Sequence, residues 1–420
     1  MMTASLAAID SAIPAVARKI RVLDALAWPD GLEDRFLDRW HAGKPELPKV
    51  SLAPRDHRSE IGELERLADQ CDDEHPAGQF LAATARSYAT AGRMLGAIGT
   101  PEFSEHSARL YRRPDFVYRR QKLTSMDSAR FFLETTDALL DSKHIPPTVA
   151  DITAQELADW MQPELDRFFG PERIRVVLDP DLASKAIAGA TRIRLRASAM
   201  FSEQDKNQLL QHEAFVHAAT AQNGMAQANL GCLGLGSPRT TETQEGIAML
   251  AELLTGSIDI QRLRRIALRV IAVQQALDGA DFVEVFRGFL DAGQSEEESF
   301  RSTQRVFRGG DVRGGVAFTK DACYLSGMIS VHTLLRVAIR DNRPELVRQL
   351  FAGRLTSADA VRLAPLFESG WLKMPSYVPP WAQDMRRLAA AFAFSAFIGQ
   401  IKLDLVDLER FVRLEDERYL

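Results

Sequence analysis

The chain has 420 residues, of which 46% are hydrophobic and 26% are charged, with a formal net charge of −5. This balance is typical of a folded protein with one large core or two smaller ones, and it argues against general nucleic-acid binding, which needs a basic surface. The three cysteines are scattered and form no C-x-x-C pair, so we expect no disulfide framework and a reducing, cytoplasmic location. The longest apolar run, 388–398, is too short to cross a bilayer, so we expect no membrane contact.

Residues 1–150 are predicted to form an N-terminal helical region that packs on the core. Apolar residues recur every three or four positions between residues 4 and 26, the pattern of an amphipathic helix. Further helices are predicted at 59–71, 77–97, 102–111 and 127–140.

Basic and aromatic residues interleave in the segment 109–122. Such a segment can grip a phosphate backbone or an acidic peptide tail. It can equally be a solvated face on which arginine stems cover apolar surface. If the protein is a peptidase, an acidic peptide is the more coherent partner of the two.

Residues 151–420 are predicted to form the catalytic domain, and strand-like sequence appears only there. After a helix at 154–169, the candidate strands are Ile174–Leu178 and Thr191–Ala197. The second alternates strictly and carries three arginines, which suits an edge strand. An extended peptide can add to such an edge, or the edge can be a plain one without a ligand. Helices are predicted for most of the remainder, ending with one at 381–416, so the fold class is mainly α with a small β-sheet (α+β).

A helix just after the strands carries two histidines and a glutamate. Ser202 and Asp205 are spaced as a capping box that begins this helix. His212 and His217 flank Glu213 in the pattern H-E-x-x-x-H. Neutral imidazoles bind Zn²⁺, and a glutamate between them can take a proton from a zinc-bound water. The sequence therefore predicts His212 and His217 as metal ligands and Glu213 as the catalytic base.

The spacing of the two histidines needs a departure from α-helical geometry. Five residues rotate through about 500°, which places the two rings roughly 140° apart on a regular helix. A π-bulge lowers the rotation per residue and returns the rings to one face. We therefore predict a bulge across Ala214–Val216, without which the histidines cannot share a metal.

The third metal ligand is predicted on the next helix. Thr241 and Gln244 are spaced as a capping box, which starts a helix and places Glu245 in its first turn. The alternative role of Glu245 is only to favour the positive end of the helix dipole. Glu252 lies two turns further along the same face. It is placed to orient a metal ligand by a hydrogen bond to the side that faces away from the metal.

Two motifs connect these residues to a known family. The stretch Gln211–His217 and the sequence Gln-Glu-Gly-Ile-Ala at 244–248 resemble the QEGLA-motif family, with isoleucine in place of leucine. That family includes the flavohemoglobin expression-modulating QEGLA motif proteins of bacteria and the animal microtubule-associated tyrosine carboxypeptidases. The stretches 307–310, 318–321 and 324–325 also look like the family, and the resemblance covers most of the chain from about Asp151 onward.

The resemblance implies a zinc peptidase with a zincin-like core, an H-E-x-x-x-H helix and a downstream glutamate ligand. The animal members remove a C-terminal tyrosine from tubulin, a substrate that does not carry over by resemblance alone. In this chain the helix after the glycine-rich segment 309–315 offers Tyr324 and His332 as donors to a developing oxyanion. We favour Tyr324, although a core tyrosine is the competing interpretation.

A carboxypeptidase must also hold a free terminal carboxylate, for which a guanidinium offers bidentate geometry. Arg305, Arg308, Arg313 and Lys320 lie in the second family-like stretch, and we favour Arg308 and Lys320. The competing interpretation is ordinary surface charge on a loop.

The sequence thus predicts a zinc-dependent carboxypeptidase that removes a C-terminal residue, with tyrosine as one candidate, from a peptide or protein tail. An aminopeptidase or dipeptidyl peptidase on the same core is the first alternative. A non-enzymatic regulator of flavohemoglobin expression is the second. The sequence does not indicate an oligomeric state.

Overall fold

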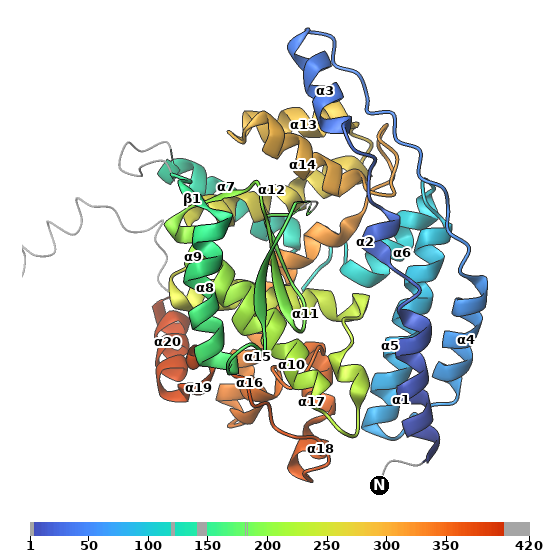
Figure 1. Cartoon of the computed structure of the whole chain (residues 1–420), viewed down its shortest axis with the longest axis vertical. Helices are drawn as coiled ribbons and strands as arrows, with labels where there is room; N and C mark the ends of the chain where they lie inside the picture. The colour runs from blue at the N-terminus through green and yellow to red at the C-terminus, as the bar shows by residue number, and fades with distance from the viewer. Residues whose placement is uncertain (1–3, 119–121, 141–148, 181, 183, 399–420) are drawn as a thin grey trace, which may run out of the picture.

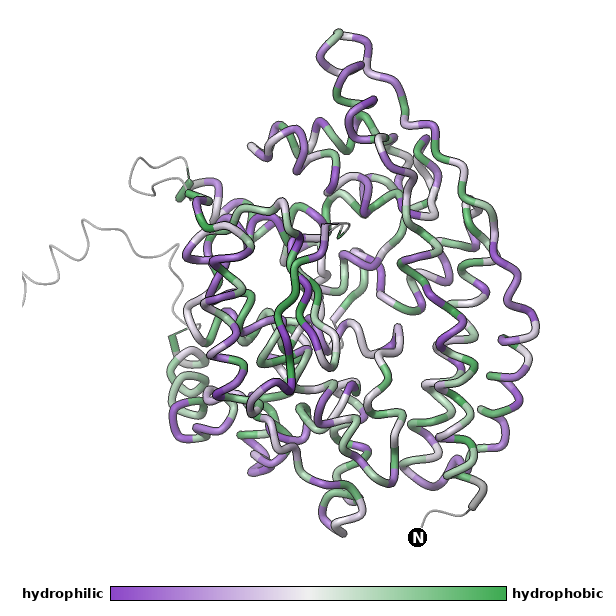
Figure 2. Tube along the Cα trace, in the orientation of Figure 1, coloured by the Kyte–Doolittle hydropathy of each residue, from purple (hydrophilic) through white to green (hydrophobic). Residues whose placement is uncertain are grey.

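The computed structural model describes residues 4–118, 122–140, 149–180, 182 and 184–398 (Figure 1). Helices make up most of these residues and the strands are short, so the chain is mainly α with small sheets (α+β), as predicted. The part of the predicted last helix beyond residue 398 lies outside the described residues. Hydrophobic and hydrophilic residues occupy different faces of most helices (Figure 2), as expected of helices that bury one side.

Seven helices precede residue 141 in the described part of the chain. They are α1 (Ala4–Ala17), α2 (Val22–Ala25), α3 (Leu32–His41), α4 (Arg58–Asp69), α5 (Pro76–Gly96), α6 (Pro101–Tyr111) and α7 (Ser125–Leu140). The helix predicted over 4–26 is interrupted, because a turn after Ala17 separates α1 from α2. Helices α1, α4 and α5 lie side by side along one flank of the molecule (Figure 1).

The N-terminal helices share a hydrophobic cluster with the later part of the chain. Ile13 of α1 and Phe80 of α5 belong to the same buried cluster as Ile247 and Val331. The Asp10 carboxylate also accepts hydrogen bonds from the backbone N–H groups of residues 231 and 232, at 2.7 and 2.9 Å. The first third of the chain therefore packs directly against the region that carries the predicted site.

The structure has two small sheets, of which the three-stranded one lies near the centre of the view and the two-stranded one, at the label β1, lies toward the upper left (Figure 1). The strands are β1 (Ile152–Thr153), β2 (Arg175–Asp179), β3 (Ala186–Ala188), β4 (Arg192–Arg196) and β5 (Met200–Phe201). Strands β1 and β5 pair antiparallel, whereas the second sheet has the order β2-β4-β3, with β2 parallel and β3 antiparallel to β4.

The two strands expected from the sequence are confirmed as β2 and β4, but the prediction that β4 is an edge strand is wrong. The short strand β3, which the sequence did not suggest, pairs along its other side and makes β4 the middle strand. Ile193 and Leu195 of β4 are fully buried in a cluster with residues of α8 and of the helix that carries His212 and His217. The exposed edge near the site therefore belongs to β3.

The remaining helices form the body of the molecule. They are α8 (Ala154–Phe169), α9 (Glu203–Leu209), the π-helix η1 (Leu210–Ala218), α10 (Ala219–Met225), the 3₁₀ turns η2 (Gly231–Gly234) and η3 (Pro238–Thr240), α11 (Thr241–Thr255), α12 (Ile260–Leu277), α13 (Phe282–Asp291), α14 (Glu296–Phe307), the 3₁₀ turn η4 (Thr319–Ala322), α15 (Cys323–Arg340), α16 (Glu345–Gln349), α17 (Ser357–Arg362), α18 (Ala364–Glu368), α19 (Pro380–Gln383) and α20 (Met385–Ile398).

Helices α11 and α15 pack closely in the interior, and two glycines allow this. A Cβ atom on Gly246 of α11 would lie 2.3 Å from the carbonyl carbon of Gly327 of α15. The segment Thr319–Arg340 is the one described helical stretch with the length and apolarity of a membrane span, and half of it is buried inside the protein. Its packing against α11 is that of a core helix.

Candidate functional site

The stretch with the two histidines is a π-helix nine residues long. Ser202 and Asp205 form the expected capping box, which begins α9, and the backbone passes from α9 into η1 at Leu210. The predicted local departure from α-helical geometry is therefore present, but it spans Leu210–Ala218 rather than only Ala214–Val216. Because a π-helix bonds residue i to residue i+5, His212 and His217 lie one turn apart on one face.

Helix α11 brings the third side chain, although its start differs from the prediction. The 3₁₀ turn η3 runs straight into α11, so Thr240 is already helical and no side chain caps the helix. The predicted capping box of Thr241 and Gln244 is wrong, and the helix begins at Thr241, which places Glu245 fifth in it. The Gln244 side chain instead accepts a hydrogen bond from the Thr220 hydroxyl at 2.7 Å.

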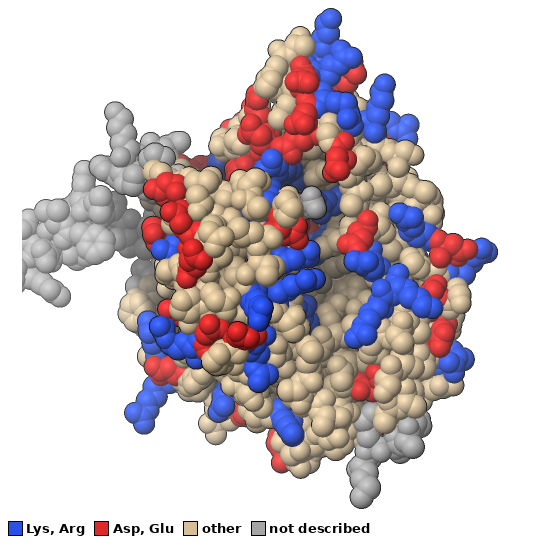
Figure 3. Space-filling view, viewed as in Figure 1, with Lys and Arg blue, Asp and Glu red and all other residues tan. Residues whose placement is uncertain are grey.

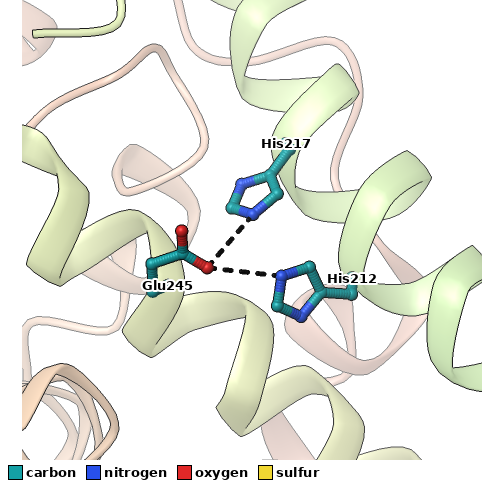
Figure 4. Close-up of side chains that lie close together, drawn as sticks. All are labelled: His212, His217 and Glu245. Atoms are coloured by element: carbon teal, nitrogen blue, oxygen red, sulfur yellow. Dashed lines mark ion pairs between the residues drawn. The ribbon is translucent and has the colours of Figure 1, made fainter. Parts of the chain in front are cut away.

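The three predicted ligands point toward one another from two helices (Figure 4). Glu245 Oε2 lies 3.4 Å from His212 Nε2 and 3.6 Å from His217 Nε2. One ligand atom from each of the three residues lies within 4.8 Å of the others. Tetrahedral ligands at zinc distances of about 2.0–2.2 Å are separated by roughly 3.3–3.5 Å, so the two contacts of Glu245 are close to the spacing of a zinc ligand set.

Glu252 orients His212 from behind, as its position on α11 suggested. His212 Nδ1 lies 2.6 Å from Glu252 Oε1, and this contact leaves Nε2 directed at Glu245. Gln208 donates to the same Glu252 oxygen at 2.8 Å, and Arg262 Nη2 donates to it at 2.6 Å. Carboxylate–histidine contacts of this kind fix the tautomer and ring orientation of a metal ligand.

The charges around the cluster favour a cation at its centre. Burial lowers the pKa of His212, but the contacts with Glu245 and Glu252 outweigh burial and raise that pKa to about 10. Burial raises the pKa of Glu245, but the Lys320 ammonium and the contacts with His212 and His217 hold it well below its usual range. Glu245 Oε2 is also buried without a hydrogen bond among the described residues. A buried oxygen that faces two imidazoles and lacks a donor fits a divalent metal ion.

Glu213 lies beside the cluster and touches the edge strand. Its Oε2 accepts a hydrogen bond from the backbone N–H of Ala188 in β3 at 2.8 Å. The missed strand β3 is thus the element that holds the predicted base. Glu213 lines the same cavity as His212, His217 and Glu245.

Tyr324 and Lys320 lie on the far side of Glu245. Lys320 Nζ is 3.5 Å from Glu245 Oε1 and 5.2 Å from the centre of the Tyr324 ring. Burial and the charge of Glu245 raise the pKa of Tyr324, so this phenol stays protonated and can donate a hydrogen bond. The alternative donor, His332, does not line the cavity and packs against Phe392.

The four cations singled out in the sequence have different surroundings. Arg305 makes a bidentate pair with the buried Asp321 at 2.7 and 2.6 Å. Arg313 pairs with Asp311 on the surface and is absent from the cavity lining. Lys320 is engaged by Glu245, as described. Arg308 lines the cavity, and its buried Nε has no hydrogen-bond partner among the described residues.

The cluster opens onto a cavity of about 730 Å³ whose walls are strongly cationic. Lysine and arginine side chains gather around the hollow in the middle of this face (Figure 3). The cations that line it are Arg194, Arg301, Arg305, Arg308, Lys320 and Arg354. Arg354 was not anticipated, because it follows a short helix in a stretch that matches no motif. Strand β3 was not predicted either, because its sequence carries no local strand pattern.

The basic and aromatic segment is largely satisfied within the protein. Arg112 pairs with Glu242 at 3.1 Å and stacks on Phe116, and Arg113 pairs with Asp115 at 3.0 Å. Tyr111, at the start of the segment, is buried and lines the cavity. Residues 119–121 lie outside the described residues. The described part of the segment therefore contributes a cavity wall more than a free basic surface.

Together these features define a mainly helical α+β protein with a buried His–His–Glu cluster, of metal-ligand type, on the wall of a cationic cavity. The family model described as microtubule-associated tyrosine carboxypeptidase matches residues 34–400. The chain belongs to this family, which agrees with the QEGLA-motif resemblance. Membership indicates a peptidase of the carboxypeptidase type.

Two further comparisons complete this picture. No curated protein matches the chain. Among solved structures, a candidate lipoprotein from Colwellia psychrerythraea is similar over 80% of this chain and 73% of its own, with 12% identity and a TM-score of 0.47.

Proposed function

We propose that this protein is a zinc-dependent carboxypeptidase that releases the last residue of a peptide or protein tail. The observation that carries the proposal is the convergence of His212, His217 and Glu245, with one ligand atom of each within 4.8 Å of the others and Glu245 Oε2 3.4 and 3.6 Å from the two imidazoles. This cluster lies in a cationic cavity of a chain that belongs to a carboxypeptidase family.

His212, His217 and Glu245 would hold the zinc ion, and Glu252 would keep His212 in its metal-binding orientation. Bound there, zinc would supply a Lewis acid that polarises a carbonyl and acidifies water. Glu213 would accept the proton of the attacking water and later deliver it to the leaving amine. The Ala188 N–H, 2.8 Å from Glu213 Oε2, would keep that carboxylate in place.

Strand β3 offers a place for an extended substrate. The backbone groups of Lys185 and Gly189 bond to β4, through Arg196 N–H at 2.9 Å and Arg192 C=O at 2.8 Å. The alternation of strand geometry therefore turns the backbone groups of Ala186 and Ala188 away from β4, toward the cavity that both residues line. Of these groups, the Ala188 N–H already donates to Glu213 and the Ala186 carbonyl accepts from the Ser184 hydroxyl, so an added peptide would pair with the remaining ones or displace the Ser184 contact. A peptide added to this edge would lie beside Glu213.

Tyr324 would donate a hydrogen bond to the oxyanion that develops from the scissile carbonyl. Lys320 would position Glu245 through their contact at 3.5 Å rather than bind the terminal carboxylate. Arg305 is already committed to Asp321, so Arg308 alone among the predicted carboxylate-binding residues keeps a free guanidinium. Tyr88, Tyr111 and Phe318 line the cavity and would form an aromatic wall for a C-terminal side chain such as tyrosine.

The proposal is tested by incubating the zinc-loaded protein with pairs of peptides that have free or amidated C-termini, followed by mass spectrometry. We expect the loss of one C-terminal residue, and only from the free termini. Loss of residues from the N-terminus would instead identify an aminopeptidase or dipeptidyl peptidase. No cleavage by protein with one zinc per chain would leave a non-enzymatic regulator, including one of flavohemoglobin expression. The excess of cations over carboxylates on the cavity walls favours the carboxypeptidase, because a free amine would need carboxylate partners and Glu213, Glu245 and Asp321 are already engaged.

A further inference from the structure

The cations of the cavity differ in whether they already have a carboxylate partner. Arg194 pairs with Asp179 at 3.1 Å and Arg301 pairs with Glu33 at 2.8 Å. Arg305 and Lys320 are held by Asp321 and Glu245, as described above. Among the described residues, Arg308 and Arg354 are left without an ion-pair partner, and the Nε of each is buried without an acceptor. A partly buried guanidinium whose buried Nε lacks an acceptor is costly, which points to an anionic group supplied by a ligand.

The backbone around Arg354 is built to hold its side chain against the cavity wall. Arg354 N–H donates to the carbonyl of Leu233 at 2.7 Å, which fixes the start of the side chain. Gly236 leaves room for the guanidinium, because a Cβ atom at that position would lie 2.7 Å from Arg354 Nη1. The same wall carries two further buried polar atoms without partners, Ser237 Oγ and Gln244 Nε2. Donors without partners therefore gather on this side of the cavity.

Arg354 and Arg308 face different parts of the site. Arg354 Nη1 lies against Gly236, where an added Cβ atom would be 2.7 Å away. Gly236 lines the cavity beside Ser237 and Gln244. Burial lowers the pKa of Arg354, and the charges of Tyr88, Glu245 and Glu213 oppose that lowering. The acidic group that acts on Arg308 is Asp321, which already pairs with Arg305. A terminal carboxylate lies only one residue, roughly 3.8 Å of chain, beyond the scissile bond. Its binding partner must therefore lie close to the proposed metal ligands, and Gln244, on the cavity wall that also carries Arg354, directly precedes one of them, Glu245.

We propose that Arg354 is the residue that binds the terminal carboxylate of the substrate, with Ser237 and Gln244 as neighbouring donors. This assignment rests on the proposed carboxypeptidase function and replaces Arg308 in that role. Arg354 is thus a specificity-determining residue: it makes the enzyme act on free C-termini.

The experiment compares the binding of two labelled neutral peptides that end in tyrosine, one with a free and one with an amidated C-terminus. Fluorescence anisotropy is measured on zinc-loaded Glu213→Gln protein, so that no cleavage occurs. We expect the free acid to bind about tenfold to a hundredfold more tightly than the amide, the usual range for a charge-assisted hydrogen-bonded pair. Arg354→Gln in this background should abolish the preference, and Arg354→Lys should restore only part of it.

Arg308→Gln is the matched control, since it removes the other free guanidinium of the same cavity and should keep the preference. Circular dichroism and zinc content confirm that each variant is folded and loaded. The assignment is overturned if Arg308→Gln abolishes the preference, if Arg354→Gln retains it, or if the reference protein shows none. Binding with the expected preference but no cleavage by the wild-type protein would refute the peptidase and leave the Arg354 assignment standing.

Discussion

The two ends of the cavity are built in opposite ways. At the metal end, polar groups that surround the cluster are paired with one another: Gln208, Glu252 and Arg262 together fix the outer face of His212. At the cationic end, taken here as the walls that carry Arg308 and, in a separate place, Arg354, the two guanidinium groups have no acceptor among the described residues. The difference fits the two proposals: the paired network would hold the ligands of a zinc ion, and the guanidinium groups without acceptors would receive an anionic group of the substrate.

The largest expected effect concerns the metal end, where one ligand is removed. Glu245→Ala should lower zinc affinity by about 10³-fold or more, because a structural zinc site is worth roughly 10–16 kcal/mol shared among its few ligands. Peptidase activity should fall to background. Zinc affinity is measured by competition with a chelating dye. Glu242→Ala, one turn earlier on α11 and paired with Arg112, is the control and should keep its zinc. Unchanged affinity in Glu245→Ala would remove the basis of the comparison.

Glu213→Gln separates the chemistry from the metal. The amide cannot accept the proton of the attacking water, so kcat should fall by about 10²–10⁴-fold. Its oxygen can still accept the Ala188 N–H, and the three proposed ligands are untouched, so zinc should remain at one per chain. Rates are measured by mass spectrometry and zinc by elemental analysis. Loss of zinc in parallel with activity would show that Glu213 supports the cluster rather than moves a proton.

The features that could be predicted from the sequence are those set by local spacing along one helix. His212, Glu213 and His217 lie within six residues, so local spacing sufficed to predict that the two histidines lie on one face and that this needs π-helical geometry. The roles of the three residues stay a prediction. The length of that π-helix exceeded the prediction, because the preference for a π over an α turn depends on packing between helices. Glu252 was predictable because helix periodicity places it on the face of Glu245.

Features that depend on contacts between distant segments were missed. Strand β3 is three residues long, and only its pairing with β4 defines it, so β4 was wrongly predicted at the edge. The capping box at Thr241 failed because η3 continues directly into α11 and leaves no free helix end there. Arg354 meets the cavity through contacts with residues 233 and 236, more than a hundred positions earlier. Spacing along the chain carries no information about such contacts.

Tyr324→Phe tests the group that lies between the two ends. Removing an oxyanion donor typically costs about 10²–10³-fold in kcat, and KM should change little because the contact strengthens only in the transition state. Tyr111→Phe is a suitable control, since Tyr111 is also buried beside the cavity. Steady-state kinetics on one free-acid peptide measure both variants. Equal effects of the two substitutions would mean that Tyr324 is a packing residue.

Glu252→Gln tests whether the paired network at the metal end matters for metal binding. The amide keeps an oxygen for His212 but loses the charge that balances Arg262, so zinc affinity should fall by about 10–100-fold. Dye competition measures the affinity, and circular dichroism verifies the fold. The effect should be smaller than that of Glu245→Ala. An affinity equal to that of the wild type would mean that the network serves the stability of the fold alone.

The smallest effect is expected for the packing contact between α11, which carries Glu245, and α15, which carries Tyr324. Gly246 directly follows Glu245, and Gly327 lies one turn after Tyr324. Because Gly246 has no side chain, its backbone can approach the backbone of Gly327 closely. Gly246→Ala should lower the free energy of unfolding by about 1–3 kcal/mol, because the two helices must separate to admit one methyl group. Gly62→Ala in α4, where nothing lies within 4 Å of the added atom, should raise it by about 0.5–1 kcal/mol. Denaturant titration of both variants measures these changes. A stable Gly246→Ala protein would mean that α15 can shift without loss, and that the spacing between Glu245 and Tyr324 is not fixed by this contact.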